Sequence, residues 1–133
     1  DAAGLPIYPG LAKAGEASNS RINHALRVTV EESQRGYVDP ARHFASSSND
    51  RSLPPMGLRL RLKAGYGLSG FSGQALAIMK AMKKYGLIVA DNGSDWFISG
   101  TPDRRWDDDD LDQLKKVPGG AFEAVNTGPV HRD

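Results

Sequence analysis

Hydrophobic and basic residues alternate strictly in the segment GLRLRLKAG, residues 57–65. In an extended chain, successive side chains point to opposite faces, so the leucines share one face and the basic residues share the other. The two sets are Leu58, Leu60 and Leu62 on one side and Arg59, Arg61 and Lys63 on the other. This pattern predicts a strand of an antiparallel sheet that has one buried face and one face in water.

A second alternating segment, residues 22–31, raises the question of a site. Leu26, Val28 and Val30 share a predicted apolar face, and Arg27 lies on the opposite face. His24 falls in the apolar register, where a polar ring is not expected. It is either a packed, hydrogen-bonded histidine or the wall of a functional site.

The clearest helical pattern lies between Ser72 and Gly86. Ser72 is typical of an N-cap, and Gly86 stands where a glycine usually follows a helix. The residues between them form an apolar stripe at helical spacing: Leu76, Ile78, Met79, Met82 and Tyr85. We expect this helix to pack on the sheet.

The remaining pattern predicts short elements separated by turns. Residues 1–10 are expected to be a loop because of Pro6 and Pro9, and residues 45–55 a polar loop. The other expected elements are a short helix at 11–17, a short strand around 37–38, a hairpin of LIVA and WFIS around DNGSD, a helix at 109–116 and a last strand at 121–125. The predicted fold class is α+β: mainly antiparallel β-sheet, meander- or sandwich-like, with one principal helix packed on it.

Composition narrows the class of protein. The chain of 133 residues, 39% hydrophobic and 25% charged, fits one globular domain spanning 1–133. A net charge of +1 does not favour nucleic acid, and no apolar run is long enough for a membrane span. The absence of cysteine excludes disulfides, thiol nucleophiles and zinc–thiolate sites. Phosphate-binding loops, nucleophile elbows and HExxH are also missing, so we expect no cofactor.

The histidines are the first candidates for chemistry. His24 and His43 are separated by a strand and a turn, and a sheet would be able to bring them together. With one carboxylate, such as Asp91, two imidazoles make an acid–base pair or a metal site. We predict His24, His43 and Asp91 as catalytic residues and no resident metal. The alternative carboxylates are Asp1 and Asp39.

Substrate-binding candidates are cationic and aromatic. Arg27 and Arg42 are suited to a carboxylate or sulfate on a polymer, or to the acidic surface of a partner. Arg27 would join Arg59, Arg61 and Lys63 in a stripe if their strands were neighbours; otherwise they form a solvated sheet face. Trp96 and Trp106 offer flat faces for stacking on sugar rings, with burial as the alternative.

Two acidic segments are explained either by local backbone structure or by cation binding. DNGSDW, residues 91–96, fits a hairpin turn better than a calcium loop, because the longer ligand set is absent. PDRRWDDDD, residues 102–110, places aspartates where a helix N-terminus favours negative charge. A divalent cation site is the alternative for the second segment.

Several long runs resemble a family of proteins: DAAGLPIYPGL, HALRVTV, YVDPARHFASSS, LPPMGLRLRLKAGYGLSGF and YGLIVADNGSDWFISGTPDRRWDDDDL. The chain resembles the C-terminal half of secreted proteins of soil and environmental bacteria, generally without an assigned activity. The resemblance implies an extracytoplasmic location and an upstream β-rich segment or chain of the same precursor as a partner. It supplies no catalytic residues.

Together these observations predict a secreted protein that binds or acts on polysaccharide, as a glycan hydrolase or lyase-like protein with its site on the β-sheet. The alternative is a non-catalytic structural or assembly module of the cell exterior, in which flat sheet edges pack against a partner segment.

Overall fold

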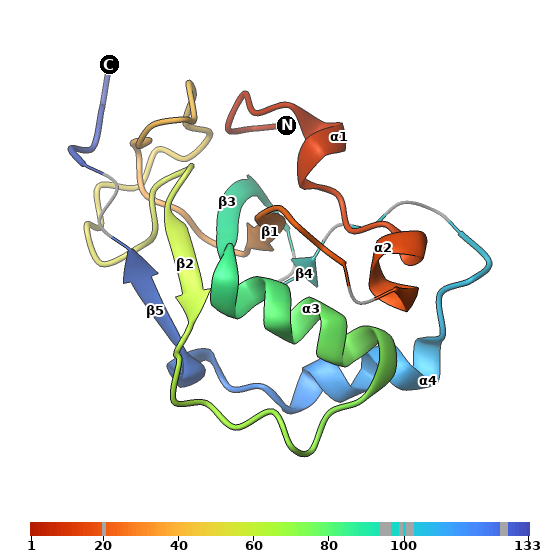
Figure 1. The fold of residues 1–133 in the computed structure, drawn as a ribbon. Coiled ribbons are helices and arrows are strands. Elements are labelled where there is room, and N and C mark those ends of the chain that lie inside the picture. Colours follow the sequence, from red (N-terminus) through yellow and green to blue (C-terminus); the bar gives the residue numbers. More distant parts are fainter. Residues whose placement is uncertain (20, 94–96, 99, 101–102, 126–127) are drawn as a thin grey trace.

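The computed structural model describes residues 1–133 except 20, 94–96, 99, 101–102 and 126–127. The described strands are β1 (Leu26–Val30), β2 (Arg59–Leu62), β3 (Leu87–Asn92), β4 (Phe97–Ile98) and β5 (Phe122–Val125). They form one sheet in the order β4-β1-β3-β2-β5 (Figure 1). Among these described strands, β1 and β3 pair in parallel and the other pairs are antiparallel. With one principal helix on this sheet, the predicted α+β class is confirmed.

The position of β1 corrects the predicted hairpin of LIVA and WFIS. The two segments do not pair with each other, because β1 lies between β3 and β4 and pairs with both. Leu26 and Val28 on β1 are at most 1% exposed, as a strand between two others requires. Residues 94–96, which include part of the predicted turn, lie outside the described residues.

Strand β2 confirms the alternation of the sequence. Leu60 and Leu62 are buried, and Arg61 and Lys63 are exposed. In register, Leu60 pairs with Leu87 of β3 and Arg59 pairs with Ile88. Paired residues share a face of a sheet. One face of β2 therefore carries leucines into the core, and the other carries basic residues.

Helix α3 (Gly73–Lys84) covers the leucine-bearing face, in front of the sheet in Figure 1. Its Met82 meets Val28, Leu87 and Ile98 of the sheet around a small cavity of about 50 Å³. Gly86 follows the helix with a φ of +82°, as predicted. The Ser72 side chain, however, makes no cap hydrogen bond; the Asp110 carboxylate accepts one from the Gln74 N–H instead, at 2.7 Å.

The short elements differ from expectation mainly at their ends. Residues 7–10 form a one-turn helix, α1 (Ile7–Gly10), where a loop was predicted. Pro9 is tolerated because the first N–H groups of a helix have no partner within it. The predicted helix at 11–17 is α2 (Ala14–Ser18), and that at 109–116 is α4 (Asp108–Leu111) followed by the 3₁₀ turn η1 (Asp112–Lys116). A second 3₁₀ turn, η2 (Gly119–Ala121), precedes β5.

Two predicted strands are shorter than expected. The segment 22–31 becomes a strand only from Leu26, so His24 precedes β1 instead of lying within its apolar face. Around Tyr37 the described chain forms isolated β-bridges to Met56 and to His131 instead of the predicted short strand.

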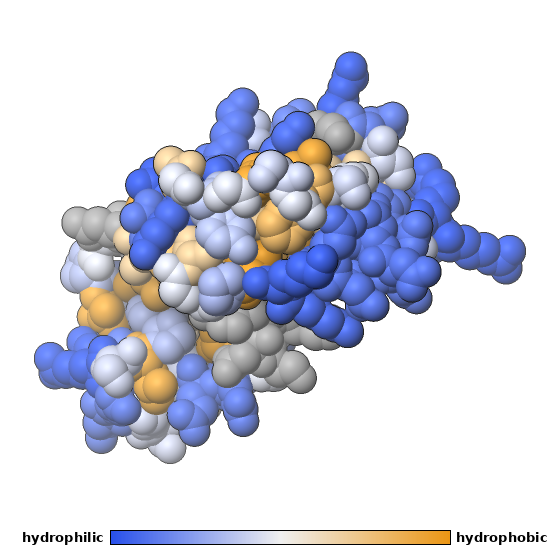
Figure 2. Space-filling view, turned by 90° about the horizontal axis from the view of Figure 1, so that it is seen from below, coloured by the Kyte–Doolittle hydropathy of each residue, from blue (hydrophilic) through white to orange (hydrophobic). Residues whose placement is uncertain are grey.

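The surface carries little large apolar area. Ile7, on α1, is the exposed large hydrophobic residue of the described chain, at 50%. The face that is seen from below in Figure 2 is mostly hydrophilic, with short hydrophobic strips. Among the described helices, none has the length and apolar character that crossing a bilayer requires.

Candidate functional site

The face of the sheet opposite α3 carries a pocket of about 490 Å³. Arg27 on β1 and Arg59 on β2 both pair in register with Ile88 on β3, so the three side chains form one row on this face. The pocket is lined by Gly4, Leu5, Pro6, Pro9, Gly10, His24, Ala25, Arg27, Pro40, Arg42, Arg59, Ile88 and Ala90. We call it the cationic pocket.

The N-terminal segment forms one wall of the cationic pocket. The Ala3 N–H donates to the Ala90 carbonyl at the end of β3, at 3.1 Å. The Ala3 carbonyl accepts from the N–H groups of Arg42 and His43, at 2.8 and 3.3 Å. These bonds tie the first residues to the sheet on one side and to the 40–43 loop on the other, and so position Arg42 at the pocket.

Arg27 is the buried cation of the pocket. Its guanidinium donates to the Asp1 carboxylate at 2.8 Å, and both side chains are at most 9% exposed. Burial lowers the pKa of Arg27 by desolvation, and the negative charge of Asp91 opposes this shift. Arginine still stays charged at neutral pH, so Arg27 and Asp1 form a neutralised pair that supports the wall.

Arg42 and Arg59 differ from Arg27 because their charges are not neutralised. Arg42 is exposed, and Arg59 is half-buried beside Ile88. Among the residues that the structure describes, no carboxylate forms an ion pair with either guanidinium. The cationic pocket therefore carries two available guanidinium groups.

His24 has both ring nitrogens engaged. Its Nδ1 lies 2.9 Å from the Ala25 carbonyl oxygen, and its Nε2 lies 3.0 Å from a carboxylate oxygen of Glu16 on α2. Both partners are acceptors, so a ring nitrogen that carries a proton donates it to the partner it faces. His24 lines the pocket but joins α2 to the start of β1.

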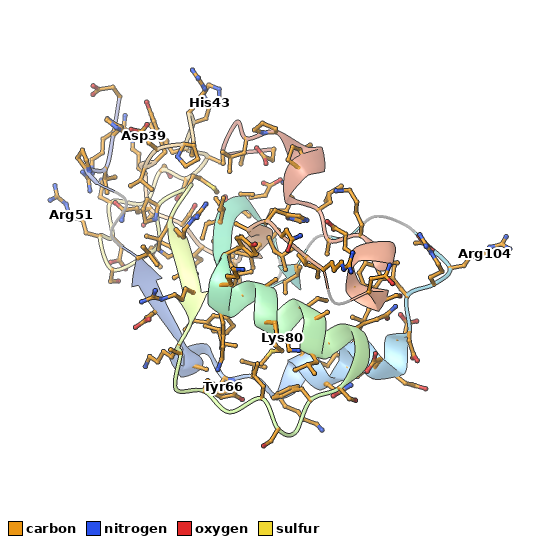
Figure 3. All side chains as sticks on the ribbon, viewed as in Figure 1. Asp39, His43, Arg51, Tyr66, Lys80 and Arg104 are labelled. Carbon is orange, nitrogen blue, oxygen red and sulfur yellow. The ribbon has the colours of Figure 1, made fainter. Side chains whose placement is uncertain are left out.

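The other predicted catalytic residues lie outside the pocket. His43 is exposed on its loop and extends outward at the upper edge of the fold (Figure 3). Asp91, near the end of β3, accepts from the Asn92 N–H at 2.9 Å. No described hydrogen bond or ion pair joins these residues to each other or to His24, and their joint catalytic role stays a prediction.

Trp106 does not extend the pocket either. Trp106 is partly buried against the core and does not line the cationic pocket. Trp96 lies outside the described residues.

The acidic run at 102–110 is a helix start, as its position predicts. The Asp107 carboxylate caps α4 by accepting from the Asp109 and Asp110 N–H groups. Hydrogen bonds from Arg105 lower the pKa of Asp103 to about 2. Within the described part of the chain, no cluster of three or more His, Cys, Asp or Glu residues is placed to hold a metal ion.

A larger groove of about 670 Å³ lies elsewhere, over the ends of β1 and β2. Its lining includes the apolar residues Val30, Leu58 and Leu60 and the charged residues Glu31 and Arg51. Among the described residues, none of the predicted site residues lines it, so we regard the cationic pocket as the candidate site.

Sequence reasoning placed Arg27, Arg42 and His24 among the site residues and named Arg59 only in a stripe that required its strand to neighbour that of Arg27. The alternation of β2 put Arg59 on the correct face, but β1 and β2 are separated by β3, so the register of β3 was also needed. The sequence spacing between Glu16 and His24 matches no recognisable motif, because Glu16 belongs to a different element.

No protein-family model, curated protein or solved structure matches this chain. The resemblance to secreted proteins of environmental bacteria therefore stays a prediction.

Proposed function

We propose that this chain is secreted and binds an acidic polysaccharide, with one carboxylate or sulfate group of the polymer in the cationic pocket. The observation that carries the proposal is the presence of two guanidinium groups, Arg42 and Arg59, that line one pocket without a carboxylate partner in the described chain. Guanidinium groups donate paired hydrogen bonds to oxyanions, and such charge-assisted bonds are stronger than neutral ones.

The walls of the pocket suit the body of a sugar. Pro6, Pro9, Pro40 and Ile88 contribute apolar surface beside the guanidinium groups. Ligand sites commonly combine apolar walls with a few polar groups that fix orientation. The C–H face of a sugar ring can lie against these walls while its acidic substituent meets Arg42 and Arg59.

The proposal is for binding without cleavage. Glycoside hydrolysis ordinarily uses two carboxylates that flank the scissile bond, and no Asp or Glu is among the described residues that line the cationic pocket. His24 is held by two acceptors. The described lining of the pocket thus offers cations for recognition but not the pair of carboxylates that hydrolysis ordinarily uses.

Calorimetric titration tests the proposal with polygalacturonate, chondroitin sulfate and neutral dextran. We expect at least one acidic glycan to bind, dextran not to bind, and no reducing ends to be released. The double variant Arg42→Gln/Arg59→Gln should lose affinity by about tenfold or more, since each charge-assisted hydrogen bond is worth about 1.5–3 kcal/mol.

The matched control is Arg51→Gln/Arg104→Gln, which makes the same charge change at two exposed arginines elsewhere (Figure 3). Circular dichroism establishes that both variants fold. The proposal is wrong if neither acidic glycan binds, or if the control loses as much affinity as the pocket variant.

An assembly module remains the alternative, and the edge position of β5 favours it. An edge strand offers unpaired backbone groups to a partner strand. Light scattering distinguishes the two: a glycan-binding domain stays monomeric without ligand, whereas an edge-pairing module associates as its concentration rises.

A further inference from the structure

The cations of the pocket continue along β2. Residues 59, 61 and 63 alternate with the buried Leu60 and Leu62, so their side chains share the face opposite α3. The Lys63 N–H donates to the Ala121 carbonyl at 2.9 Å, which extends the pairing of β2 with the chain before β5. Lys63 therefore follows Arg59 and Arg61 in one line on the sheet.

The line of cations is longer than one small anionic group. A strand rises about 3.3 Å per residue, so the Cα atoms of Arg59 and Lys63 are about 13 Å apart. Arg59 belongs to the pocket, whereas Arg61 and Lys63 lie beyond its lining. A single carboxylate bound by Arg42 and Arg59 leaves these two cations unused.

The two outer cations are accessible and weakly engaged. Lys63 is exposed, and no ion pair joins it to a residue of the described chain. Arg61 donates to the Glu123 carboxylate of β5 at 2.9 Å, with 53% of its side chain exposed. Ion pairs this exposed contribute little to stability, so an anionic ligand competes with Glu123 at low energetic cost.

We propose that the ligand is a polyanionic chain that runs from the cationic pocket along β2, with successive acidic groups at Arg59, Arg61 and Lys63. This inference rests on the proposed function and adds the direction and minimum length of the ligand. It also assigns Glu123 a role: its carboxylate occupies Arg61 in the free protein and weakens binding of the polymer.

Oligogalacturonates of two and eight units test the inference by calorimetry. We expect the octamer to bind more tightly than the dimer. Lys63→Gln should weaken octamer binding about two- to fivefold, the range for one exposed charge, and leave dimer binding unchanged. Glu123→Gln should strengthen octamer binding by a similar factor, because Arg61 is released.

Two controls make the same charge changes off the line: Lys80→Gln on α3 (Figure 3) and Glu32→Gln, both at exposed residues. Equal affinities for the two oligomers, or equal effects of the variants and their controls, would overturn the inference while the pocket proposal stands. If neither oligomer binds the unaltered chain and chondroitin sulfate does not bind it either, the proposed function is overturned as well.

Discussion

Gly86 shows how one residue sets the junction between α3 and β3. Its φ is +82°, and a Cβ atom built on it would lie 2.4 Å from the Leu60 carbonyl oxygen. Its own carbonyl accepts from the Leu26 N–H at 3.1 Å, where β1 begins. The close approach of β2 and the positive φ both require a residue without a side chain.

Gly86→Ala should therefore destabilise the fold. A left-handed conformation costs a non-glycine residue about 1–2 kcal/mol, and the clash with the β2 backbone adds to this cost. We expect urea unfolding to show a loss of about 2–4 kcal/mol.

Gly65→Ala is the matched control, because its φ is not positive and a Cβ atom added there would meet no other atom within 4 Å. We expect a change below about 0.5 kcal/mol at this position. Similar losses at both positions would show that the junction is not constrained as described.

For His24, the sequence pattern did not predict the surroundings of the side chain. Alternation indicates which residues share a face, but it does not indicate where a strand begins. Because β1 begins at Leu26, His24 left the predicted apolar face and turned to Glu16, eight residues earlier on α2. Local spacing predicted Gly86 correctly because a helix end depends on local backbone geometry, whereas the partner of His24 depends on how α2 packs.

At the scale of elements, the acidic run of α4 serves two helices. Asp107 caps α4, as the sequence indicates. Asp110 reaches the start of α3 and accepts from the Gln74 N–H, 36 residues away in sequence. Sequence reasoning assigned the α3 cap to Ser72 because a cap is expected to be local, and the tertiary contact replaced it.

Asp110→Ala should cost more stability than Asp109→Ala. Both changes remove one negative charge from the first turn of α4, so each loses a similar dipole interaction. Only Asp110 also binds the N-terminus of α3, where loss of a cap costs about 1 kcal/mol, and it accepts a second hydrogen bond from the Gln113 side chain. In thermal or urea unfolding, the free energy of unfolding of Asp110→Ala should be about 1 kcal/mol lower than that of Asp109→Ala. Equal stabilities would mean that the bond to Gln74 adds nothing.

At the scale of the whole molecule, the antiparallel part of the sheet was predictable, and the parallel pair was not. The alternation of β2 and the final segment 121–125 identified strands with one wet face. The run LIVA of β3 has no polar alternation, which is typical of a strand buried on both faces. The sequence nevertheless predicted a hairpin of LIVA with WFIS, because pairing of β3 with β1, a strand distant in sequence, leaves no local trace.

This sheet order predicts how stability is distributed. β1 and β3 lie inside the sheet with neighbours on both sides, whereas β5 is an edge strand that pairs only with β2 among the described strands. Interior strands exchange their amide protons mainly through global unfolding, and edge strands open locally. In native-state hydrogen exchange, we expect paired amides of β1 and β3 to report the full unfolding free energy. Paired amides of β5 should exchange at least about tenfold faster, equivalent to about 1.4 kcal/mol. Protection of β5 equal to that of β1 would instead mean that the sheet opens as one unit, and the edge assigned to β5 would be covered.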